Sequence, residues 1–388
     1  MLEWLLLLLL PLAAACGWYA GFKYQASRNL EPEDHVTRDY LVGLNYLINE
    51  RPDKAVDVFI KMLEVNSDTV ETHLALGSLF RRRGEVERAI RIHQNLIARP
   101  QLTKEQRFHA LSELGVDYLQ AGMLDRAERV FLELIALGGE VATGFNHLLH
   151  IYQQQKDWKQ AITVAEKIQA AESTEMPIAY YYCELAEKAR LEGQIDEARD
   201  YLRQALAKDH SCVRAYILLG KLHQDAGAYK DAIALYRRVI EQDPDYLAEV
   251  VVPLIECYSK LDREDEVMGY LQERLEEFPR IALIVVLSGY IRKRQGDEMA
   301  INFIAQHLPR CLSLRGVAQL LDIYLDTADD ATKKRLLLLK DPVEKLLKNK
   351  PLYRCVHCGF SSRQLYWQCP SCKRWAGIRP IHGVEYKE

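Results

Sequence analysis

Four cysteines near the C-terminus form two closely spaced pairs. Cys355 and Cys358 make the first Cys-x-x-Cys motif, Cys369 and Cys372 make the second, and ten residues separate the two motifs. Each motif wraps one turn of chain around an ion so that both thiolates face it, and two motifs complete a tetrahedral sulfur shell. The spacing therefore predicts a site for one metal ion, with two disulfides or four idle thiols as the alternatives.

Zinc is the expected ion, because it is redox-inert and binds a sulfur cage tightly, although a single iron takes the same four ligands. Gly359 follows the first motif directly and can adopt the left-handed backbone that such a turn requires. Pro370 lies inside the second motif, where a tight turn is needed. Iron would open an alternative role in electron transfer, and colour separates the two metals, since ferric thiolates absorb visible light.

Length and composition are those of an ordinary globular protein. The chain has 388 residues, enough for two or three domains, of which 49% are apolar and 27% charged. A formal net charge of -4 argues against a protein that coats nucleic acid. Between Lys340 and Arg379, however, nine Lys and Arg face only Asp341 and Glu344. We interpret these cations as a solvated face, with RNA, an anionic lipid surface or an acidic protein as alternative contacts.

The N-terminus carries a second strong signal. Residues 4–22, WLLLLLLPLAAACGWYAGF, contain no charge, and a helix of that length, at roughly 1.5 Å per residue, crosses a bilayer core. Glu3 is the only charged side chain before this run, whereas a cleaved signal peptide normally begins with Lys or Arg. Lys23 and Arg28 follow the run, so the positive-inside rule predicts an exported N-terminus and a cytoplasmic remainder. Cleavage before Cys16, as in a lipoprotein, is the alternative.

Between these ends a small residue recurs at intervals of 33 to 38 residues in helix-like stretches. These marker positions are Ala55, Ala89, Ala127, Ala161, Ala198, Ala232, Val267 and Ala300. A glycine lies five residues before several markers, where a turn would join two helices. Other glycines, Gly77, Gly115 and Gly220 among them, lie twelve residues before a marker and would let two helices approach closely.

This pattern resembles the tetratricopeptide repeat, a helix-turn-helix unit of about 34 residues. The residues that carry the resemblance are Leu219, Gly220, Gly227, Ala232, Tyr236 and Pro244. About eight such units span residues 36–312, and each leaves an apolar face that only its neighbour can cover. The predicted fold is therefore all-α: a right-handed tetratricopeptide-repeat superhelix, or α-solenoid, between a transmembrane helix and a small metal module.

In such repeats the first helix of each pair lines the concave groove, which nominates partner-binding residues. The candidates mix cations and amides and are Arg81, Arg82, Asn146, His150, Arg190, Arg214, Lys221, Lys260 and Arg292. This chemistry suits an extended peptide that needs several weak, spread contacts to its backbone and carboxylates. The alternative at each position is a solvated residue on a helix surface.

Familiar catalytic motifs are absent from the sequence. It contains no phosphate-binding Gly-x-x-x-x-Gly-Lys loop, no Gly-x-Gly-x-x-Gly, no His-Glu-x-x-His and no nucleophile elbow. A closed four-thiolate site also leaves no open metal position for chemistry. The sequence therefore predicts a binding protein rather than an enzyme.

The order of these parts, together with CVHCGF...LYWQCPSCKRWAGIRP at the C-terminus, resembles the lipopolysaccharide assembly protein B family over the whole chain. The resemblance implies a single-pass inner-membrane protein with a periplasmic N-terminus and a rubredoxin-like zinc ribbon whose ligands are the four C-terminal cysteines. It also implies an adaptor that brings the lipid A pathway deacetylase to an FtsH-type membrane protease for degradation. Lipopolysaccharide assembly protein A and lipopolysaccharide itself are further candidate partners, and a homo-oligomer stays open.

The predicted domains follow from these landmarks. They are a transmembrane anchor at 1–23, a linker at 24–35, the repeats at 36–312, a helical connector at 313–350 and the rubredoxin-like domain at 351–388. Two other functions compete with the adaptor: a general scaffold for envelope complexes, and a zinc-ribbon protein that binds nucleic acid.

The ribbon carries more apolar surface than so small a module can bury alone. Leu352, Phe360, Tyr366, Trp367 and Trp375 lie within about two dozen residues of one another. We therefore expect the ribbon to pack back onto the repeats, which would make its metal important for the stability of both parts.

Overall fold

The computed structural model describes residues 70–381 except 101, 139–140, 173–175, 312 and 349, and in addition 18–19, 41–43, 45–46, 54 and 58. The chain divides into two compact units, Met1–Lys156 and Asp157–Glu388. The predicted anchor, linker and first repeat therefore lie almost wholly outside the described residues. Among the helices that the structure does describe, none has both the length and the apolar character needed to span a membrane.

In the first unit, the regular structure described from residue 70 onward is helical. They are α4 (Val70–Arg82), α5 (Val86–Ile97), α6 (Lys104–Gln120), α7 (Leu124–Ala136) and α8 (Val141–Gln155). Each helix packs against the next one along the chain, and α4 also contacts α6. The start of α6 is fixed by a capping box, in which Thr103 and Gln106 each accept a hydrogen bond from the other's backbone amide.

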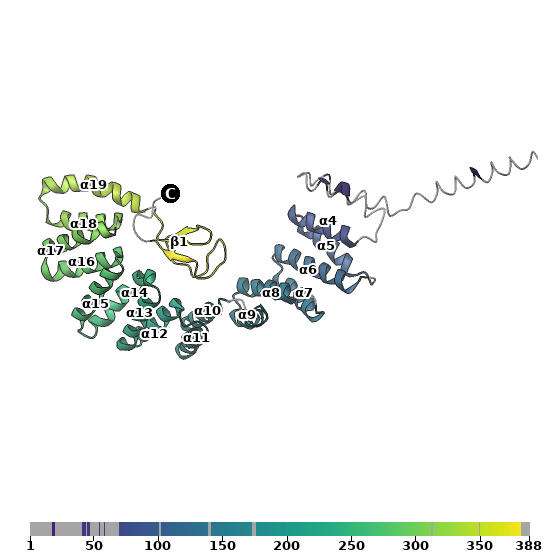
Figure 1. The fold of residues 1–388 in the computed structure, drawn as a ribbon, viewed down its shortest axis with the longest axis horizontal. Helices are drawn as coiled ribbons and strands as arrows, with labels where there is room; N and C mark the ends of the chain where they lie inside the picture. The colour runs from purple at the N-terminus through teal and green to yellow at the C-terminus, as the bar shows by residue number, and fades with distance from the viewer. Residues whose placement is uncertain are drawn as a thin grey trace, which may run out of the picture. The chain divides into compact units, whose positions relative to one another are not determined.

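The second unit is itself a row of helices that ends in a small sheet (Figure 1). Its α-helices are α9 (Trp158–Glu172), α10 (Ile178–Leu191), α11 (Ile195–Lys208), α12 (Val213–Asp225), α13 (Tyr229–Gln242), α14 (Leu247–Ser259), α15 (Glu264–Glu277), α16 (Ile281–Gln295), α17 (Asp297–His307), α18 (Leu314–Thr327) and α19 (Asp330–Lys348). The 3-10 turns η1 (Pro244–Tyr246) and η2 (Leu308–Arg310) precede α14 and α18. Consecutive helices that pack against each other, such as α10 with α11 and α12 with α13, form the repeats.

The marker residues lie where the repeat pattern predicts. From Ala89 to Ala300, all seven described markers are fully buried, with no exposed surface. Four residues later along the same helix, Phe131, Leu202 and Tyr236 are also buried. Contacts between neighbouring repeats, rather than a central core, therefore stabilise each unit.

The turn within each pair requires a left-handed backbone whatever residue occupies it. Gly84, Gly122, Gly193 and Gly227 have φ between 71° and 81°. Two repeats without this glycine have the same geometry, with Lys156 at φ 57° and Asp262 at φ 55°, each five residues before its marker. The packing of the helix pair thus imposes a conformation that costs a side chain of this kind roughly 1–2 kcal/mol.

The second set of glycines permits close contact between helices. A Cβ atom added at Gly77, Gly115 or Gly220 would lie 2.3, 2.5 or 2.6 Å from the ring of His93, Phe131 or Tyr236, respectively. These distances are well inside van der Waals contact, and the rings are buried. The prediction that these glycines let paired helices approach closely is confirmed.

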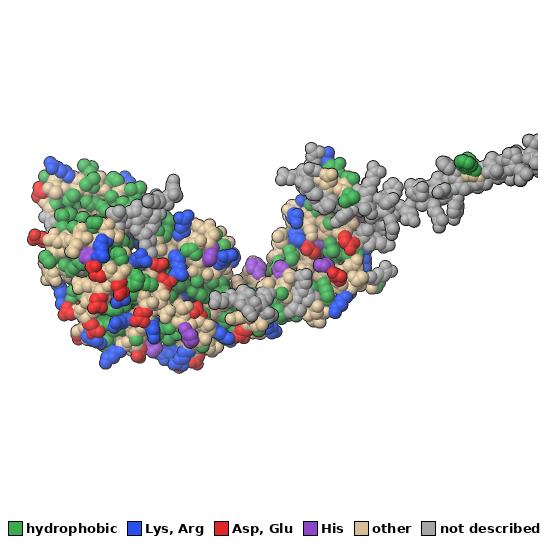
Figure 2. All heavy atoms as spheres, viewed as in Figure 1, with side chains coloured by type: hydrophobic (Ala, Val, Ile, Leu, Met, Phe, Trp, Pro, Cys, Tyr) green, Lys and Arg blue, Asp and Glu red, His purple; other side chains and the backbone are tan. Residues whose placement is uncertain are grey.

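Residues 314–348 form a further helix pair, α18 and α19, which pack against each other and follow α17 in the row. The outer helix, α19, is unusual because Leu337, Leu338, Leu339 and Leu346 are all exposed. Figure 2 shows apolar side chains gathered at the surface over this end of the second unit. Exposed leucines at the last pair are expected where no further described repeat covers them.

Two glycine substitutions test the close approach in the repeats. Gly220→Ala should destabilise the second unit by about 1–3 kcal/mol, because the new methyl group would overlap the ring of Tyr236. Gly269→Ala is the matched control, since Gly269 lies in α15 with no atom within 4 Å of an added Cβ. It should stabilise the unit by up to about 1 kcal/mol through helix propensity. Urea unfolding measures the free energy of unfolding of both variants. Equal changes in this free energy would show that the ring of Tyr236 does not exclude a methyl group at residue 220.

Candidate metal centre and its contact with the repeats

The C-terminal ribbon is a three-stranded antiparallel sheet in the order β2-β1-β3. Its strands are β1 (Tyr353–Cys355), β2 (Ser361–Ser362) and β3 (Ile378–Pro380). Strands this short form few ladder hydrogen bonds, and sheets of this size are marginal in water. A metal ion is therefore the natural source of stability for the module.

Two tight turns present the cysteines. In the first, Gly359 donates its N–H to the Cys355 carbonyl at 3.0 Å and has φ 76°. In the second, Lys373 donates to the Cys369 carbonyl at 2.9 Å and has φ 59°. The prediction for Gly359 is confirmed, and the second turn places a lysine in the same left-handed conformation.

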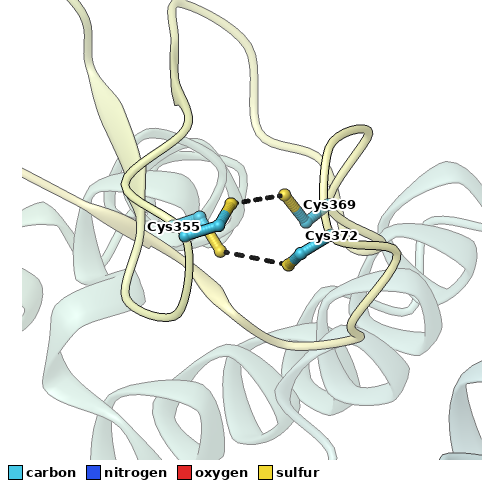
Figure 3. A group of neighbouring side chains, drawn as sticks. Cys355, Cys369 and Cys372 are labelled. Atoms are coloured by element: carbon cyan, nitrogen blue, oxygen red, sulfur yellow. Dashed lines mark hydrogen bonds between the residues drawn. The ribbon is translucent and has the colours of Figure 1, made fainter. Parts of the chain in front are cut away.

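The four sulfur atoms converge on one point (Figure 3). All four Sγ atoms lie within 4.8 Å of one another, with Cys355 and Cys372 3.8 Å apart and Cys358 and Cys369 3.6 Å apart. A tetrahedron with metal–sulfur bonds of about 2.3 Å has edges of about 3.8 Å, so the cage fits a zinc-sized ion. These separations are too long for disulfides, whose sulfur atoms are about 2.05 Å apart. The four thiolates therefore form a closed site for one metal ion.

At Cys358 the local backbone favours the thiolate form that a metal ion requires, whereas the neighbouring cysteines raise the pKa of Cys372 to about 11. A hydrogen bond from the Phe360 backbone lowers the pKa of the Cys358 thiol to about 6. Cys355 and Cys369 are buried, whereas Cys358 is exposed. Cys358 is therefore both open to solvent and favoured as the thiolate, which is the form that binds metal. A metal ion can reach the site from solvent on this side.

Trp375 joins the ribbon to the start of the second unit. Its ring lies edge-on to Trp158 of α9 at 5.8 Å and to Tyr181 of α10 at 5.6 Å, measured between ring centroids. Tyr180 lies 5.7 Å from the same ring in a tilted arrangement. Edge-to-face aromatic pairs of this kind each contribute about 0.5–1.5 kcal/mol beyond their burial.

Trp367 makes a second aromatic contact with the repeats. It stacks on Tyr246 of η1 at 5.4 Å between centroids, and the Arg214 guanidinium lies 5.8 Å from its ring. Tyr246 is itself buried and donates its hydroxyl hydrogen to the Ile378 carbonyl of β3 at 3.1 Å. The ribbon thus contacts both the ring and the hydroxyl group of Tyr246.

Charged and polar contacts add to the aromatic ones. The Tyr353 hydroxyl donates to Glu249 of α14 at 2.5 Å, and Arg379 forms an ion pair with Asp243. Figure 1 shows the ribbon on the inner side of the curve formed by the helices of the second unit. The expectation that the ribbon packs onto the repeats is confirmed for Trp367 and Trp375. Phe360 and Tyr366 pack instead on each other within the ribbon, 6.5 Å apart.

Arg214 is not an open groove residue. It is only 4% exposed, and its guanidinium donates to Glu184 at 2.7 Å and to Glu187 at 3.1 Å beside Trp367. Burial opposes its charge, but the two carboxylates outweigh that effect and raise its pKa. The prediction of a peptide contact is wrong at this position, because the ribbon covers the side chain and two carboxylates already occupy it.

Three other predicted groove cations lie in ion pairs within the repeats. Arg81 contacts Glu113 at 2.6 Å and Asp117 at 2.7 Å, and Arg190 contacts Glu187 at 3.5 Å. Arg292 joins Asp297 at 2.5 Å and Asp326 at 2.8 Å. The candidates left at the surface are Arg82, Asn146, His150, Lys221 and Lys260. Their role in binding a partner stays a prediction.

The Arg81 pairs belong to a buried network that sequence reasoning missed. Asp117 and His93 are fully buried, and the carboxylate lies 2.5 Å from His93 Nδ1. Burial would raise the pKa of Glu113, but hydrogen bonds from Ser78 and Arg81 hold it below its ordinary value. The ionised Glu113 carboxylate therefore stabilises the fold at neutral pH. This stabilisation is lost as the pH falls through the lowered pKa of Glu113.

The residues that receive the ribbon were also missed. Trp158, Tyr180, Tyr246 and Glu249 lie far apart in sequence and were not nominated as site residues. The run of three tyrosines at 180–182 was the available signal, because adjacent aromatics on one helix cannot all face its own partner.

Known proteins match these parts in the same order. Models of the tetratricopeptide repeat match residues 72–105, 189–250 and 223–283, and a rubredoxin metal binding domain matches residues 353–380. Lipopolysaccharide assembly protein B of Escherichia coli K12 is 39% identical, covering 99% of this chain and 100% of that protein. The protein of the same name from Haemophilus influenzae is 35% identical, covering 98% of this chain and 99% of that protein. The crystal structure of MamA, at 22% identity and a TM-score of 0.35, covers 45% of this chain and 92% of that one.

Fold and site together define a tetratricopeptide-repeat protein that ends in a rubredoxin-like metal ribbon. Identity of 35–39% over 98–99% of the chain is more specific, because one alignment includes the N-terminal residues, the repeats and the ribbon. The chain belongs to the lipopolysaccharide assembly protein B family.

Removing two ligands tests the metal centre. The double variant Cys369→Ser and Cys372→Ser should lose its one metal ion, because two thiolates cannot hold a structural zinc site. The ribbon should then lose protection from amide hydrogen exchange, and the aromatic contacts with α9, α10 and η1 should open. Metal analysis and exchange of the purified chain measure both effects. A metal-free variant whose ribbon stays protected would contradict the assigned role of the ion.

Replacing one indole tests the contact between ribbon and repeats. Trp375→Ala should weaken that contact by about 2–3 kcal/mol, since it removes three ring contacts while leaving all four cysteines in place. Tyr366→Ala is the matched control, because its ring contacts only Phe360 among the described aromatic residues, and it should cost less than about 1 kcal/mol. Limited proteolysis at residues 349–352 reports the contact. Equal cleavage of the two variants, both with full metal content, would show that Trp375 does not hold the ribbon.

Proposed function

We propose that this chain is a membrane-tethered adaptor that restrains lipopolysaccharide synthesis. It binds the lipid A pathway deacetylase on the cytoplasmic side of the inner membrane and presents it to an FtsH-type protease. The observation that carries this proposal is the full-length likeness to relatives named lipopolysaccharide assembly protein B. The alignment with the Escherichia coli relative covers 99% of this chain and 100% of that protein.

The architecture supports binding rather than chemistry. Tetratricopeptide repeats are surfaces for other proteins, and the ribbon's four thiolates form a closed cage without a position for substrate. The cations of the ribbon are also partly engaged, since Arg379 pairs with Asp243 of the repeats. These contacts favour an adaptor over the alternative of a nucleic-acid-binding ribbon.

The apolar run at residues 4–22 supplies the tether in this proposal. Confinement to the bilayer raises the effective concentration of a bound client near a membrane protease without any further contact. The repeats and the ribbon then need only hold the client. Degradation is the work of the protease.

Depleting the protein in cells should lengthen the half-life of the deacetylase severalfold, and lipopolysaccharide should accumulate. A chain that lacks residues 1–23 should fail to restore the short half-life, whereas one carrying an unrelated membrane span should restore it. Immunoblots after a block of protein synthesis measure the half-life. An unchanged half-life on depletion would overturn the adaptor role, and full rescue by the untethered chain would overturn the tether.

A further inference from the structure

A cavity of about 280 Å³ lies where the ribbon meets the repeats. Its apolar walls come from α14 and α16 on one side, including Val252, Ala282 and Val285, and from Leu352 and Ile381 of the ribbon on the other. The volume is close to the lower end for sites that bind small ligands or side chains. Val252 is 53% exposed at this cavity, so apolar surface is open to solvent there.

The polar groups around the cavity differ in their availability. Asp245 accepts from Arg280 at 2.7 Å, and Glu249 accepts from the Tyr353 hydroxyl at 2.5 Å. Arg315, at the start of α18, also lines the cavity, and no described carboxylate forms an ion pair with it. Within the described part of the chain, the Arg315 guanidinium therefore keeps donors for a ligand, while Asp245 and Glu249 each already accept a hydrogen bond. A ligand with a carboxylate beside an apolar group matches this arrangement.

The same face of the repeats already binds apolar side chains of one polypeptide segment. Trp375 and Trp367 of the ribbon pack against α10 and η1, and the cavity continues this interface along the first helices of the next pairs, α14 and α16. The ribbon covers one part of the face and leaves the cavity beside it. A peptide is thus the ligand class that the neighbouring contacts favour.

We propose that this cavity anchors a partner peptide, taking one aliphatic side chain against α14 and α16 while a nearby Asp or Glu of the peptide bonds to Arg315. The proposal rests on the adaptor role and gives that role a docking site. Because Leu352 and Ile381 form one wall, the site is complete only when the ribbon is folded. The metal ion would then control partner binding without touching the partner.

A selection from random peptides tests the site without assuming a client. Full-length protein in detergent is the target for a library of random dodecapeptides displayed on phage. Enriched peptides should share an aliphatic residue within about three positions of an Asp or Glu. They should bind Ala282→Trp, whose indole fills the cavity, at least tenfold more weakly than wild type. Ala207→Trp, at an exposed position of α11, is the matched control and should bind normally.

Two further variants keep the test decisive. Val252→Glu repels acidic peptides and alters an exposed side chain, so it carries the test if Ala282→Trp disturbs folding or metal content. Arg315→Gln should weaken the acidic peptides severalfold but leave versions with Asn or Gln in place of the acid unchanged. A library without enriched sequences, or peptides that bind Ala282→Trp and Val252→Glu as well as wild type, would overturn the cavity as a docking site.

The cellular result separates this proposal from the adaptor role. If depletion lengthens the deacetylase half-life but Val252→Glu does not, the adaptor role stands and the cavity is not the client's site. If depletion has no effect, the adaptor role fails, while peptide selection still decides whether the cavity binds acidic aliphatic peptides.

Discussion

Repulsion among four converging thiolates is the constraint on which the ribbon and its contact with the repeats depend. Thiolates held 3.6–3.8 Å apart repel one another strongly unless a cation lies between them. With the ion in place, two turns and three very short strands become a rigid body. That body has one orientation in which Trp367, Trp375 and Tyr353 can all reach the repeats. We therefore expect the metal ion to organise an interface that it does not itself touch.

The interface changes how the repeat surface is used. The repeat pattern by itself predicts an open groove for a peptide, lined by cations such as Arg214 and Lys221. In the second unit the ribbon covers part of this face, and Arg214 lies beneath it between two glutamates and an indole. Burying that arginine is tolerated because both carboxylates and the ring compensate for lost water. The surface left for a partner is consequently a composite of repeats and ribbon.

In the repeats, packing between helices competes with the backbone conformation that each residue prefers by itself. A left-handed turn within the pair is needed for the marker residue to reach the facing helix, and glycine supplies it most easily. Lys156 and Asp262 adopt that conformation without glycine, so packing of the pair outweighs the local cost. The glycines opposite His93, Phe131 and Tyr236 have no such freedom, because any Cβ would overlap a ring. Tolerance to substitution therefore differs between two glycine positions that look alike in sequence.

The sequence by itself determined the helix pairs and the metal ligands, because both are encoded by short-range spacing. Intervals of 33 to 38 residues fix which side chains face a neighbouring helix, and two residues between cysteines fix a turn around an ion. Only the tertiary structure decided what the ribbon contacts and which cations stay open. Trp158 and Trp375 are separated by more than two hundred residues, and the repeat pattern does not predict a contact between residues so far apart in sequence. Arg214 and Lys221 lie seven residues apart on α12 and so on about the same side of that helix, yet only Arg214 lies beneath the ribbon. Their difference comes from the packing of a distant module, which the local sequence around either residue does not contain.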